Sequence, residues 1–257
     1  MTARIYTAQH LERGIRISLP PAAARHVQVL RFQPGNSITL FNGSGDALTN
    51  PEGEFTATVQ TMGRSDVEVL VGDFVATQRE PARAVHLAIG MPANDRMDWL
   101  VEKAVELGVA SIAPLMTERS VLRLAGERAD KKLAHWRGIT IAACEQCGRN
   151  RLPVIHAPAS LADWLARGMA NPANAGDQRV LLSLRPGTQP LSFLLAGATA
   201  GRGSVTFLSG PEGGLGALEE AAALARGFVP ATLGQRVLRA ETAPLACLSL
   251  VTLAAGE

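Results

Sequence analysis

The sequence predicts an α/β protein in which a small β domain precedes a larger domain built on a mostly parallel sheet. Two observations lead to this prediction. Up to residue 75, short segments rich in β-branched and aromatic residues alternate with turn sequences such as QPGN and NGSGD. From residue 84 onward, apolar strand-like segments alternate with segments of helical periodicity. That alternation is typical of βα units on a parallel sheet with helices on both faces.

The first domain, residues 1–75, is expected to be a small β-barrel, because regular short strands separated by Gly and Pro are typical of such barrels. Its predicted strands cover residues 14–20, 37–43, 54–62 and 66–74. Between the first two strands, residues 20–32 begin with a proline pair and are expected to form a helix. Residues 76–83 are polar and lack periodicity, so they predict a linker.

The second domain, residues 84–257, is expected to alternate strands and helices. Its predicted strands cover residues 84–90, 110–116, 152–156, 179–184, 204–209 and 228–234. Its predicted helices cover residues 95–108, 127–148, 160–168, 217–227 and 242–256. Gly108 is expected to end the first of these helices, and Ser160 is expected to cap the third at its amino terminus.

The composition indicates a soluble, folded, cytoplasmic protein. Of the 257 residues, 47% are apolar and 19% are charged, proportions typical of globular proteins. No secretory signal is evident at the amino terminus. The longest apolar run near the carboxyl terminus, APLACLSLVTLAA, has 13 residues, well short of the roughly 20 that span a bilayer. We therefore expect no association with a membrane.

Several kinds of site are excluded because their motifs are absent. The sequence contains no P-loop, no GxGxxG after a strand and no GxSxG elbow. Its five His are scattered without ligand spacing, so no metal site is expected. Cys144 and Cys147 form a lone CxxC, which admits a redox interpretation. The simpler interpretation is two small residues near a helix end, because the motif ends a helical pattern instead of opening one.

Charge is unevenly distributed along a chain whose formal net charge is +2. Residues 1–75 carry six Arg and seven acidic residues, whereas residues 118–151 carry eight Lys and Arg against four acidic residues. The local excess of positive charge indicates a polyanionic partner. A solvated helix face explains the same pattern and is slightly favoured by the charges alone.

A glycine-rich loop, LSGPEGG, follows the predicted strand SVTFLS. In open α/β sheets, ligands bind beyond the carboxyl ends of the strands. Gly210, Gly213 and Gly214 permit positive φ and close backbone approach, and Pro211 stiffens the loop. The carboxylate of Glu212 suits a cationic or amine-bearing ligand better than a phosphate. A generic glycine turn is the alternative interpretation.

A second loop of the same form, LGQRVLRAETAP, joins the last predicted strand to the last predicted helix. Val237 and Leu238 are apolar loop residues that suit the flanks of an aromatic ring. Thr242 is expected to cap the helix, with Pro244 just inside it. Glu241 lies near the positive end of the helix dipole. Apolar walls, backbone polar groups and charges together predict a small-molecule pocket.

A family resemblance rests on five ordered segments: VEKAVELGV, PLMTERS, EQCGR, LSGPEGG and LGQRVLRAETA. They resemble the RsmE-type family of SPOUT-class RNA methyltransferases, which use S-adenosylmethionine to methylate N3 of a uridine in 16S ribosomal RNA. The resemblance covers nearly the whole chain, since HVQVLRFQPGNSITLFNG is similar to the family's PUA-like amino-terminal barrel. Cys147 stands where Ser is expected in the family, a nearly isosteric difference.

The resemblance implies features that periodicity does not show. They are a trefoil-knotted methyltransferase domain over residues 84–257, a PUA-like RNA-binding barrel over residues 1–75, and a homodimer with the last helix near its interface. S-adenosylmethionine is expected to lie in the knot, between three loops, which by matching motifs are LSLRPG (the region 183–187), LSGPEGG and LGQRVLRAETA. The residues that the resemblance assigns to the cofactor are Leu184, Leu208, Gly210, Pro211, Glu212, Gly213, Gly214, Leu233, Gly234, Val237, Leu238, Arg239, Thr242 and Ala243.

The reaction needs a group that stabilises the negative charge spreading onto uracil O2 and O4 as N3 loses its proton. A guanidinium can do so, and the candidates are Arg239, Arg149 and Arg119, in that order. Each of them can equally be a phosphate contact or a structural ion pair. Glu212 or Glu241 can orient an Arg or accept a proton, and no general base is assigned. We expect catalysis by Arg239, Arg149 and Glu241, and RNA contacts by Arg31, Arg119, Arg149 and Arg151.

The leading hypothesis is therefore methylation of 16S ribosomal RNA, within the small ribosomal subunit, by a homodimer that uses S-adenosylmethionine. The alternative is a non-enzymatic dimeric RNA-binding protein, against which the two glycine loops with carboxylates argue. A CxxC oxidoreductase is a third hypothesis, and it requires a low thiol pKa at Cys144 or Cys147.

Overall fold

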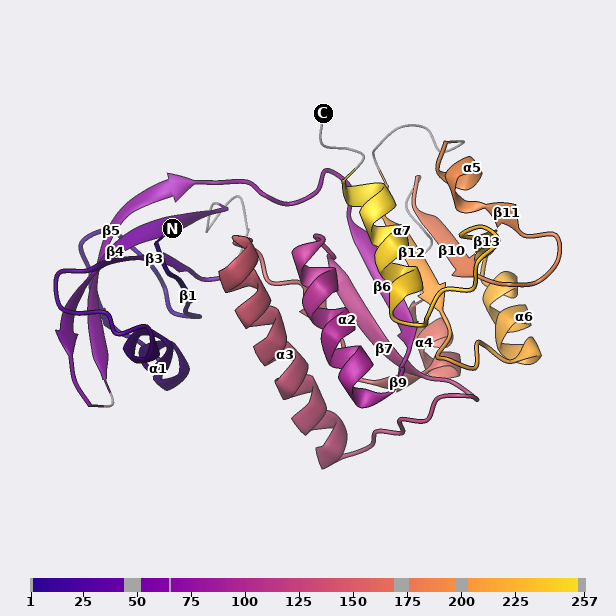
Figure 1. Cartoon of the computed structure of the whole chain (residues 1–257), viewed down its shortest axis with the longest axis horizontal. Helices are drawn as coiled ribbons and strands as arrows, with labels where there is room; N and C mark the ends of the chain where they lie inside the picture. Colours follow the sequence, from indigo (N-terminus) through magenta and orange to yellow (C-terminus); the bar gives the residue numbers. More distant parts are fainter. Residues whose placement is uncertain (1, 44–51, 65, 169–175, 197–202, 254–257) are drawn as a thin grey trace. The chain divides into compact units, whose positions relative to one another are not determined.

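In the computed structural model, the described residues are 2–43, 52–64, 66–168, 176–196 and 203–253. The chain divides into two compact units: residues 1–80 with residues 141–152, and residues 81–140 with residues 153–257. The segment 141–152, which the sequence analysis placed in the second domain, groups with the first unit. Figure 1 shows the arrangement of the helices and strands within each unit, most of them labelled.

The first unit is built on a mixed five-stranded sheet in the order β1-β3-β4-β5-β2. β1 and β3 run parallel, and the other neighbours are antiparallel. Among the described residues no pairing joins β1 to β2, so the sheet is open where a closed barrel was expected. The elements of this unit are β1 (Arg4–Tyr6), β2 (Arg16–Ser18), α1 (Pro21–Val29), β3 (Ser37–Phe41), β4 (Gly53–Met62) and β5 (Val67–Ala76).

Alternation of apolar side chains decides which face of this sheet is buried. Val67, Val69 and Val71 on β5 are at most 1% exposed, and they pack in one core with side chains of β3, β4 and α1. The helix α1 ends at Val29, earlier than expected, because Arg31 adopts a φ of 59° that a right-handed helix does not continue. β1 was not predicted because three residues are too few for a period-2 signal.

The second unit is built on a parallel sheet in the order β11-β13-β10-β12-β6-β7-β8, with β9 also paired to β7. The prediction of a mostly parallel sheet is thereby confirmed. The two-residue strands β9 and β11 are too short to have been predicted. The strands are β6 (Val85–Gly90), β7 (Ser111–Met116), β8 (Val154–Ile155), β9 (Ala159–Ser160), β10 (Gln178–Leu182), β11 (Gln189–Pro190), β12 (Val205–Ser209) and β13 (Val229–Thr232).

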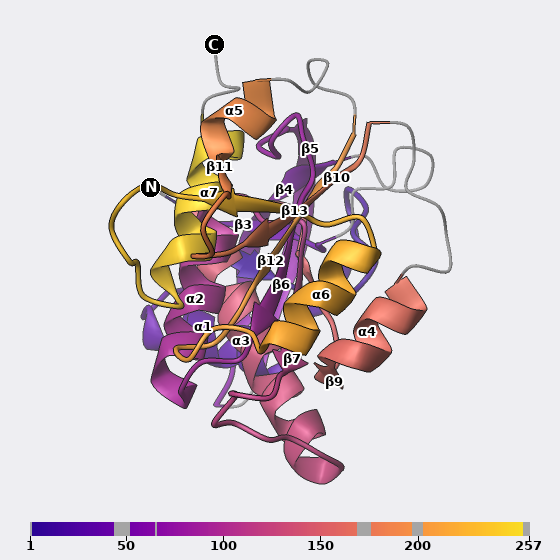
Figure 2. The same ribbon diagram turned by 90° about the vertical axis from the view of Figure 1, so that its right-hand side faces the viewer.

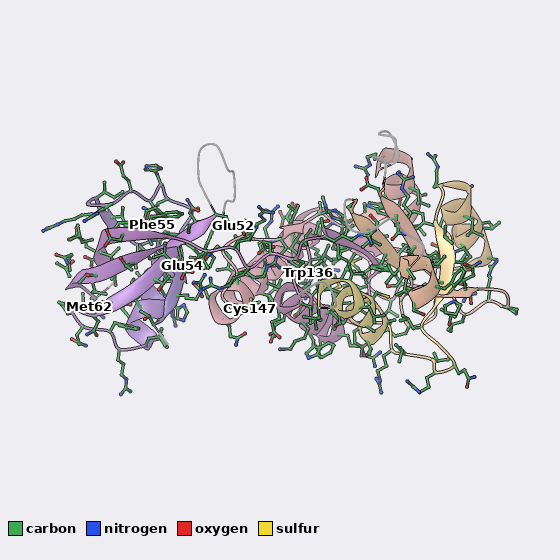
Figure 3. All side chains as sticks on the ribbon, turned by 90° about the horizontal axis from the view of Figure 1, so that it is seen from above. Glu52, Glu54, Phe55, Met62, Trp136 and Cys147 are labelled. Carbon is green, nitrogen blue, oxygen red and sulfur yellow. The ribbon has the colours of Figure 1, made fainter. Side chains whose placement is uncertain are left out.

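Helices cover both faces of this sheet (Figure 2). α7 contacts β6 and β12 and packs beside α2, whereas α4 contacts β7 and α6 contacts β10 on the opposite face. Trp136 on α3 is fully buried, and its indole N–H donates to Asp98 Oδ1 at 2.9 Å (Figure 3). The helices are α2 (Asn94–Glu106), α3 (Glu127–Cys147), α4 (Leu161–Gly168), α5 (Leu191–Ala196), α6 (Ala217–Ala225) and α7 (Thr242–Thr252).

Local signals at two helix ends are confirmed, and one is wrong. Gly108 follows α2 with a φ of 88°, and the backbone N–H of Asp163 donates to Ser160 Oγ at 3.0 Å at the start of α4. The expected cap of α7 is absent, because the helix already includes Thr242 and no side chain caps it. The last residues predicted as helix, 254–256, lie outside the described residues.

Candidate active site

Three neighbouring strands of the second unit, β13, β10 and β12, end at the same edge of the sheet. The segments that follow them enclose a cavity of about 550 Å³. Such a position beyond the carboxyl ends of parallel strands is where α/β proteins bind ligands. The cavity therefore unites the two loops that the sequence singled out with a third, after β10, that only the resemblance indicated.

Most of the residues expected to bind a cofactor line this cavity. They are Leu184, Gly210, Pro211, Glu212, Gly213, Gly214, Leu233, Val237, Leu238 and Ala243. Four others do not line it. Leu208 is fully buried in the core between the sheet and α4 and α6, and Gly234, Arg239 and Thr242 are exposed beside the cavity. Leu208 does not reach the cavity, because alternate residues of a strand point to opposite faces of the sheet.

Several lining residues were not among those expected to bind the cofactor. They are Arg119, Leu182, Ser183, Arg185, Pro186, Ser209, Leu215, Ala217, Glu220, Ala231, Thr232, Arg236 and Ala240. Ser183 and Arg185 follow a strand end, so the signal that revealed the glycine loops applied to them too. Arg119 follows the end of β7 in the same way, and it was expected to act on the uracil or the RNA instead of the cofactor. Nothing local marks Glu220, which comes from α6.

The loop after β12 requires glycine at its first position. A Cβ at Gly210 would lie 2.6 Å from the backbone carbon of Gly214 and 2.7 Å from the backbone nitrogen of Leu215. Gly214 itself has a φ of 71°, a conformation that glycine adopts at no steric cost. A Cβ at Gly213 meets only the side chain of Arg119, at 3.1 Å. Gly210 and Gly214 therefore shape the loop more strictly than Gly213.

Glu212 is held from outside the loop. Its Oε1 accepts a hydrogen bond from the backbone N–H of Ala93 at 3.1 Å and another from Arg96 Nη1 at 3.0 Å. Burial raises the pKa of Glu212, but hydrogen bonds from its own backbone and Ala93 together with the charge of Arg96 outweigh it, so the pKa lies below its ordinary value. Glu212 is therefore a carboxylate at neutral pH.

Glu241 is 8% exposed and lies beside the cavity, not in its lining. Its Oε1 is 3.9 Å from Arg96 Nε, and its Oε2 is buried without a hydrogen-bond partner among the described residues. Arg96 thus faces a carboxylate from each glycine loop. No sequence motif marks Arg96, because it lies within an ordinary helical pattern far from both loops.

The arginines near the cavity are of two kinds, those bound to another residue and those without a partner among the described residues. Arg185 pairs with Glu220 at 2.5 Å, and Arg119 donates to the backbone oxygen of Gly213 at 2.7 Å. Arg236 and Arg239 are exposed and have no ion pair or side-chain hydrogen bond among the described residues. Arg236 lines the cavity, whereas Arg239, the first catalytic candidate, lies outside its lining.

Two arginines of the first unit are structural partners of acidic residues. Arg149 is 3% exposed, and it binds Glu80 through Nε at 2.9 Å and through Nη2. Arg151 is exposed but pairs with Glu52 at 3.2 Å. Of the roles that the sequence left open for Arg149, this geometry supports the structural ion pair over a phosphate contact or a catalyst. Arg31 is exposed, as a contact with RNA requires.

The burial of Cys144 argues against the oxidoreductase hypothesis. Cys144 is fully buried, and burial raises the pKa of its thiol to about 12, although Arg149 opposes the shift. Cys147 lies half-buried at the last residue of α3. A redox-active pair needs a lowered pKa, so the simpler interpretation of the CxxC as two small residues near a helix end is the one that fits.

Two features are absent from the described part of the chain. None of its helices has both the length and the apolar character needed to cross a membrane. Within the same residues, no group of three or more His, Cys, Asp or Glu side chains is arranged to hold a metal ion.

Comparison with known proteins places this site in a family. Residues 78–252 match the family described as RNA methyltransferase domain. Ribosomal RNA small subunit methyltransferase E of Bacillus subtilis is 29% identical over 250 residues, which cover 96% of this chain and 93% of that protein. The corresponding protein of a Buchnera aphidicola strain is 28% identical over 255 residues, covering 99% and 97%.

Solved structures agree with the sequence comparisons. Ribosomal RNA small subunit methyltransferase E from Neisseria gonorrhoeae, bound to S-adenosyl methionine, has 31% identity and a TM-score of 0.85, covering 99% of this chain and 98% of that one. A putative methyltransferase from Legionella pneumophila, in complex with its bound cofactor SAM, has 33% identity and a TM-score of 0.88 over the same shares. The chain belongs to the RNA methyltransferase family, as a member of the ribosomal RNA small subunit methyltransferase E type.

Proposed function

We propose that this chain transfers the methyl group of S-adenosylmethionine to N3 of a uridine in 16S ribosomal RNA. The cavity of about 550 Å³ at the carboxyl ends of β10, β12 and β13 carries the proposal. Support also comes from two relatives of the same fold over 98% of their length, which are described as bound to this cofactor. We place the reaction in the cytoplasm, on RNA of the small ribosomal subunit.

The cavity suits S-adenosylmethionine in size and in chemistry. Its volume lies within the range of about 300–1,000 Å³ that small-molecule sites have. Leu184, Leu233 and Leu238 offer apolar contacts to an adenine ring. Ser209 lines the cavity, and its Oγ atom is buried without a hydrogen-bond partner among the described residues. A bound polar ligand satisfies such an atom, since buried polar groups are rarely left unpaired.

When bound, S-adenosylmethionine supplies an electrophilic methyl group on a positively charged sulfur. The loops hold uracil N3 in line with that methyl carbon, and such positioning can lower the barrier by roughly 7–11 kcal/mol. The N3 proton leaves to solvent, the new N3–C bond forms, and the electron pair of the broken C–S bond stays on sulfur. Arg236, which lines the cavity, and Arg239, which is exposed close to it in the same loop, stabilise the negative charge on uracil O2 and O4.

The carboxylates near the cavity have a different task from the arginines. Glu212 is a poor proton acceptor at neutral pH, because its pKa is lowered and Arg96 occupies its Oε1. Glu241 faces Arg96 as well, so of its two expected roles we assign it the orientation of an arginine. Arg119 holds the glycine loop through Gly213.

We also propose that two copies of the chain assemble through α7. Leu250, on α7, is 49% exposed, and Leu253, just after α7, is 66% exposed. Beside them lies a groove of about 430 Å³ lined by Leu233, Arg236, Leu238, Ala246, Ser249 and Leu250. A second copy covers such an apolar face at low cost, because exposed apolar patches are typical of interfaces. Light scattering at micromolar concentration is expected to give twice 27.1 kDa.

The finer features implied by the family resemblance belong to the same proposal. A trefoil knot is supported by the path of the last helix: α7 follows β13 but contacts β12 and β6, on the far side of β10. For the first unit we propose a PUA-like, RNA-binding role, with Arg31 among its contacts. Its exposed guanidinium and the sheet edges of that unit support this role.

The test is transfer of a labelled methyl group from S-adenosylmethionine to naked 16S ribosomal RNA and to assembled small subunits. We expect label in RNA, and digestion to nucleosides followed by mass spectrometry should locate it on uridine N3. Gly210→Ala serves as the control, because its extra Cβ collides with the loop backbone. Label on another nucleoside would contradict the proposed target, and no label with either substrate would contradict the proposed reaction.

A further inference from the structure

Arg96 lies between two carboxylates that come from the two glycine loops of the cavity. Its Nη1 is 3.0 Å from Glu212 Oε1, in the loop after β12. Its Nε is 3.9 Å from Glu241 Oε1, in the loop after β13. Arg96 itself does not line the cavity. A single cation outside the site therefore faces both loops that enclose it.

Arg96 is the cation that the two carboxylates share. Among the described residues, it is the ion-pair partner of Glu212 and also of Glu241. Ala93 adds a backbone N–H to Glu212, and Glu241 Oε2 is buried without a partner. The other cations near the loops are engaged elsewhere or exposed: Arg119 donates to Gly213, whereas Arg236 and Arg239 face solvent.

The base of Arg96 is rigid. It stands in the first turn of α2, where the neighbouring Met97 and the following Leu100 are fully buried in the core of the second unit. The strand before α2 also fixes the loop, since a Cβ at Gly90 would lie 2.7 Å from the backbone nitrogen of Pro211. Arg96 thus joins both loops to a packed element, as a precise ligand site requires.

We propose that Arg96 is a positioning residue that sets the cofactor-binding geometry of both loops through Glu212 and Glu241. This inference rests on the proposed function, because the loops are taken to hold S-adenosylmethionine. Its chemistry is electrostatic: one guanidinium faces the carboxylate of Glu241, whose side chain is 11% exposed, and that of Glu212, whose side chain is 34% exposed. Removing the guanidinium leaves the buried carboxylate of Glu241 without its cation.

Loss of the Arg96 guanidinium should make cofactor binding depend on pH. Without it, the two carboxylates repel each other and the loops separate. The pKa of Glu212 then rises, because the favourable charge of Arg96 is gone. Acidification protonates Glu212 and relieves the repulsion. The affinity of an Arg96→Ala variant for S-adenosylmethionine should therefore increase as pH falls from 8.0 to about 5.5, whereas that of the wild-type chain should hardly change.

The experiment is calorimetric titration of S-adenosylmethionine into the full chain at both pH values. Arg96→Ala should weaken binding about tenfold or more at pH 8.0 and recover most of it at the lower pH. In the Glu212→Gln, Glu241→Gln background the same substitution should change affinity less than about twofold, because no carboxylate remains to be balanced. Arg167→Ala is the matched control, since that arginine is exposed on α4 and 3.9 Å from Asp163.

The outcomes separate the inference from the proposed function. If the wild-type chain does not bind S-adenosylmethionine, the proposed function fails. If it binds and Arg96→Ala loses the same affinity in both backgrounds, with no recovery at low pH, Arg96 is only a packing residue and the inference fails. If Arg96→Ala does not fold, Arg96→Lys in the two backgrounds is the substitute. We expect Arg96→Lys to weaken binding of S-adenosylmethionine in the same way but by a smaller factor. It keeps the positive charge, but a lysine lacks the several fixed donors with which a guanidinium faces both carboxylates.

Discussion

Arginines of the first unit and arginines at the cavity mouth of the second unit behave in opposite ways. In the first unit, Arg149 and Arg151 are bound to Glu80 and Glu52. At the cavity mouth, Arg236 and Arg239 are exposed without a partner among the described residues. The difference teaches that an excess of positive charge in the sequence does not reveal which cations are available to a polyanion.

The reason lies in the sequence distance between partners. Glu80 precedes Arg149 by 69 residues, and Glu52 precedes Arg151 by 99. A charge count over residues 118–151 alone therefore includes arginines whose charge is balanced, in the folded chain, by acidic residues outside that segment. Lys132 in the same segment likewise faces Asp98, at 3.4 Å. The cluster is in part a set of structural ion pairs, an explanation that the charge pattern alone could not distinguish from a binding surface.

The largest expected effect comes from breaking the buried pair in the first unit. Arg149→Ala should lower the free energy of unfolding by about 3–5 kcal/mol, because it leaves Glu80 buried without its cation. Urea denaturation followed by circular dichroism measures this loss. The matched variant, Arg149→Met with Glu80→Leu, should lose much less, because no charge is left unpaired. A stable Arg149→Ala chain with weakened RNA binding would restore the phosphate-contact interpretation.

The next effect concerns the loop after β12 and compares two of its glycines. Gly210→Ala should weaken binding of S-adenosylmethionine about 100-fold, because its Cβ would lie 2.6 Å from the backbone of Gly214. Gly213→Ala should cost only a few-fold, since its Cβ meets the movable side chain of Arg119. Equilibrium dialysis with labelled cofactor compares the two. Equal losses would mean that the loop adapts and that its observed shape is not the binding shape.

A smaller effect tests the exposed arginines directly. Arg31→Ala should reduce the salt slope of RNA binding by roughly 0.7–0.9, because one phosphate contact is lost. Arg239→Ala should leave that slope nearly unchanged and lower the rate of methyl transfer, because its guanidinium is assigned to uracil O2 and O4. In both variants the free energy of unfolding should change by less than about 0.5 kcal/mol, as for most exposed residues. Filter binding across a range of salt concentrations gives the slope, and an unchanged slope for Arg31→Ala would remove Arg31 from the RNA contact surface.

The smallest expected effect concerns Cys144, whose thiol should not react with an alkylating reagent in the folded chain. Because burial raises the pKa of Cys144 to about 12, only about 10⁻⁴ of this thiol is ionised at pH 8. The thiolate fraction grows only as pH rises towards the folded pKa, so acidification cannot activate it. Iodoacetamide should therefore leave Cys144 unmodified in the folded chain and label it in urea, as mass spectrometry of the peptides would show. Rapid labelling of Cys144 in the folded chain would mean that its thiol is not buried as described.

Much of the fold and part of the site were predictable because their signals are local. Alternating strands and helices gave the parallel sheet, and the glycines around Glu212 marked a loop that lines the cavity. The closed barrel was wrong, because closure depends on a pairing between β1 and β2 that no local pattern specifies. Thr242 failed as a cap because helix ends shift by a residue without any change in periodicity.

Arg96 shows where prediction from sequence stops. It precedes Glu212 by 116 residues and stands in a helix whose apolar spacing explains its neighbours completely. Only the fold brings its guanidinium to both loops. The same holds for Glu80 and Arg149, whose role as a pair becomes visible only when residues 141–152 group with the first unit.

The most direct test of the account is a crystal structure of the chain grown with S-adenosylmethionine. The account predicts the cofactor between the segments 182–186, 209–215 and 231–238, with Ser209 Oγ hydrogen-bonded and Arg96 still between Glu212 and Glu241. The second unit also contains a cavity of about 290 Å³ near the amino ends of its strands, lined by His86, Ser111 and Trp164. Cofactor density there, with the loops at the carboxyl ends empty, would contradict the account.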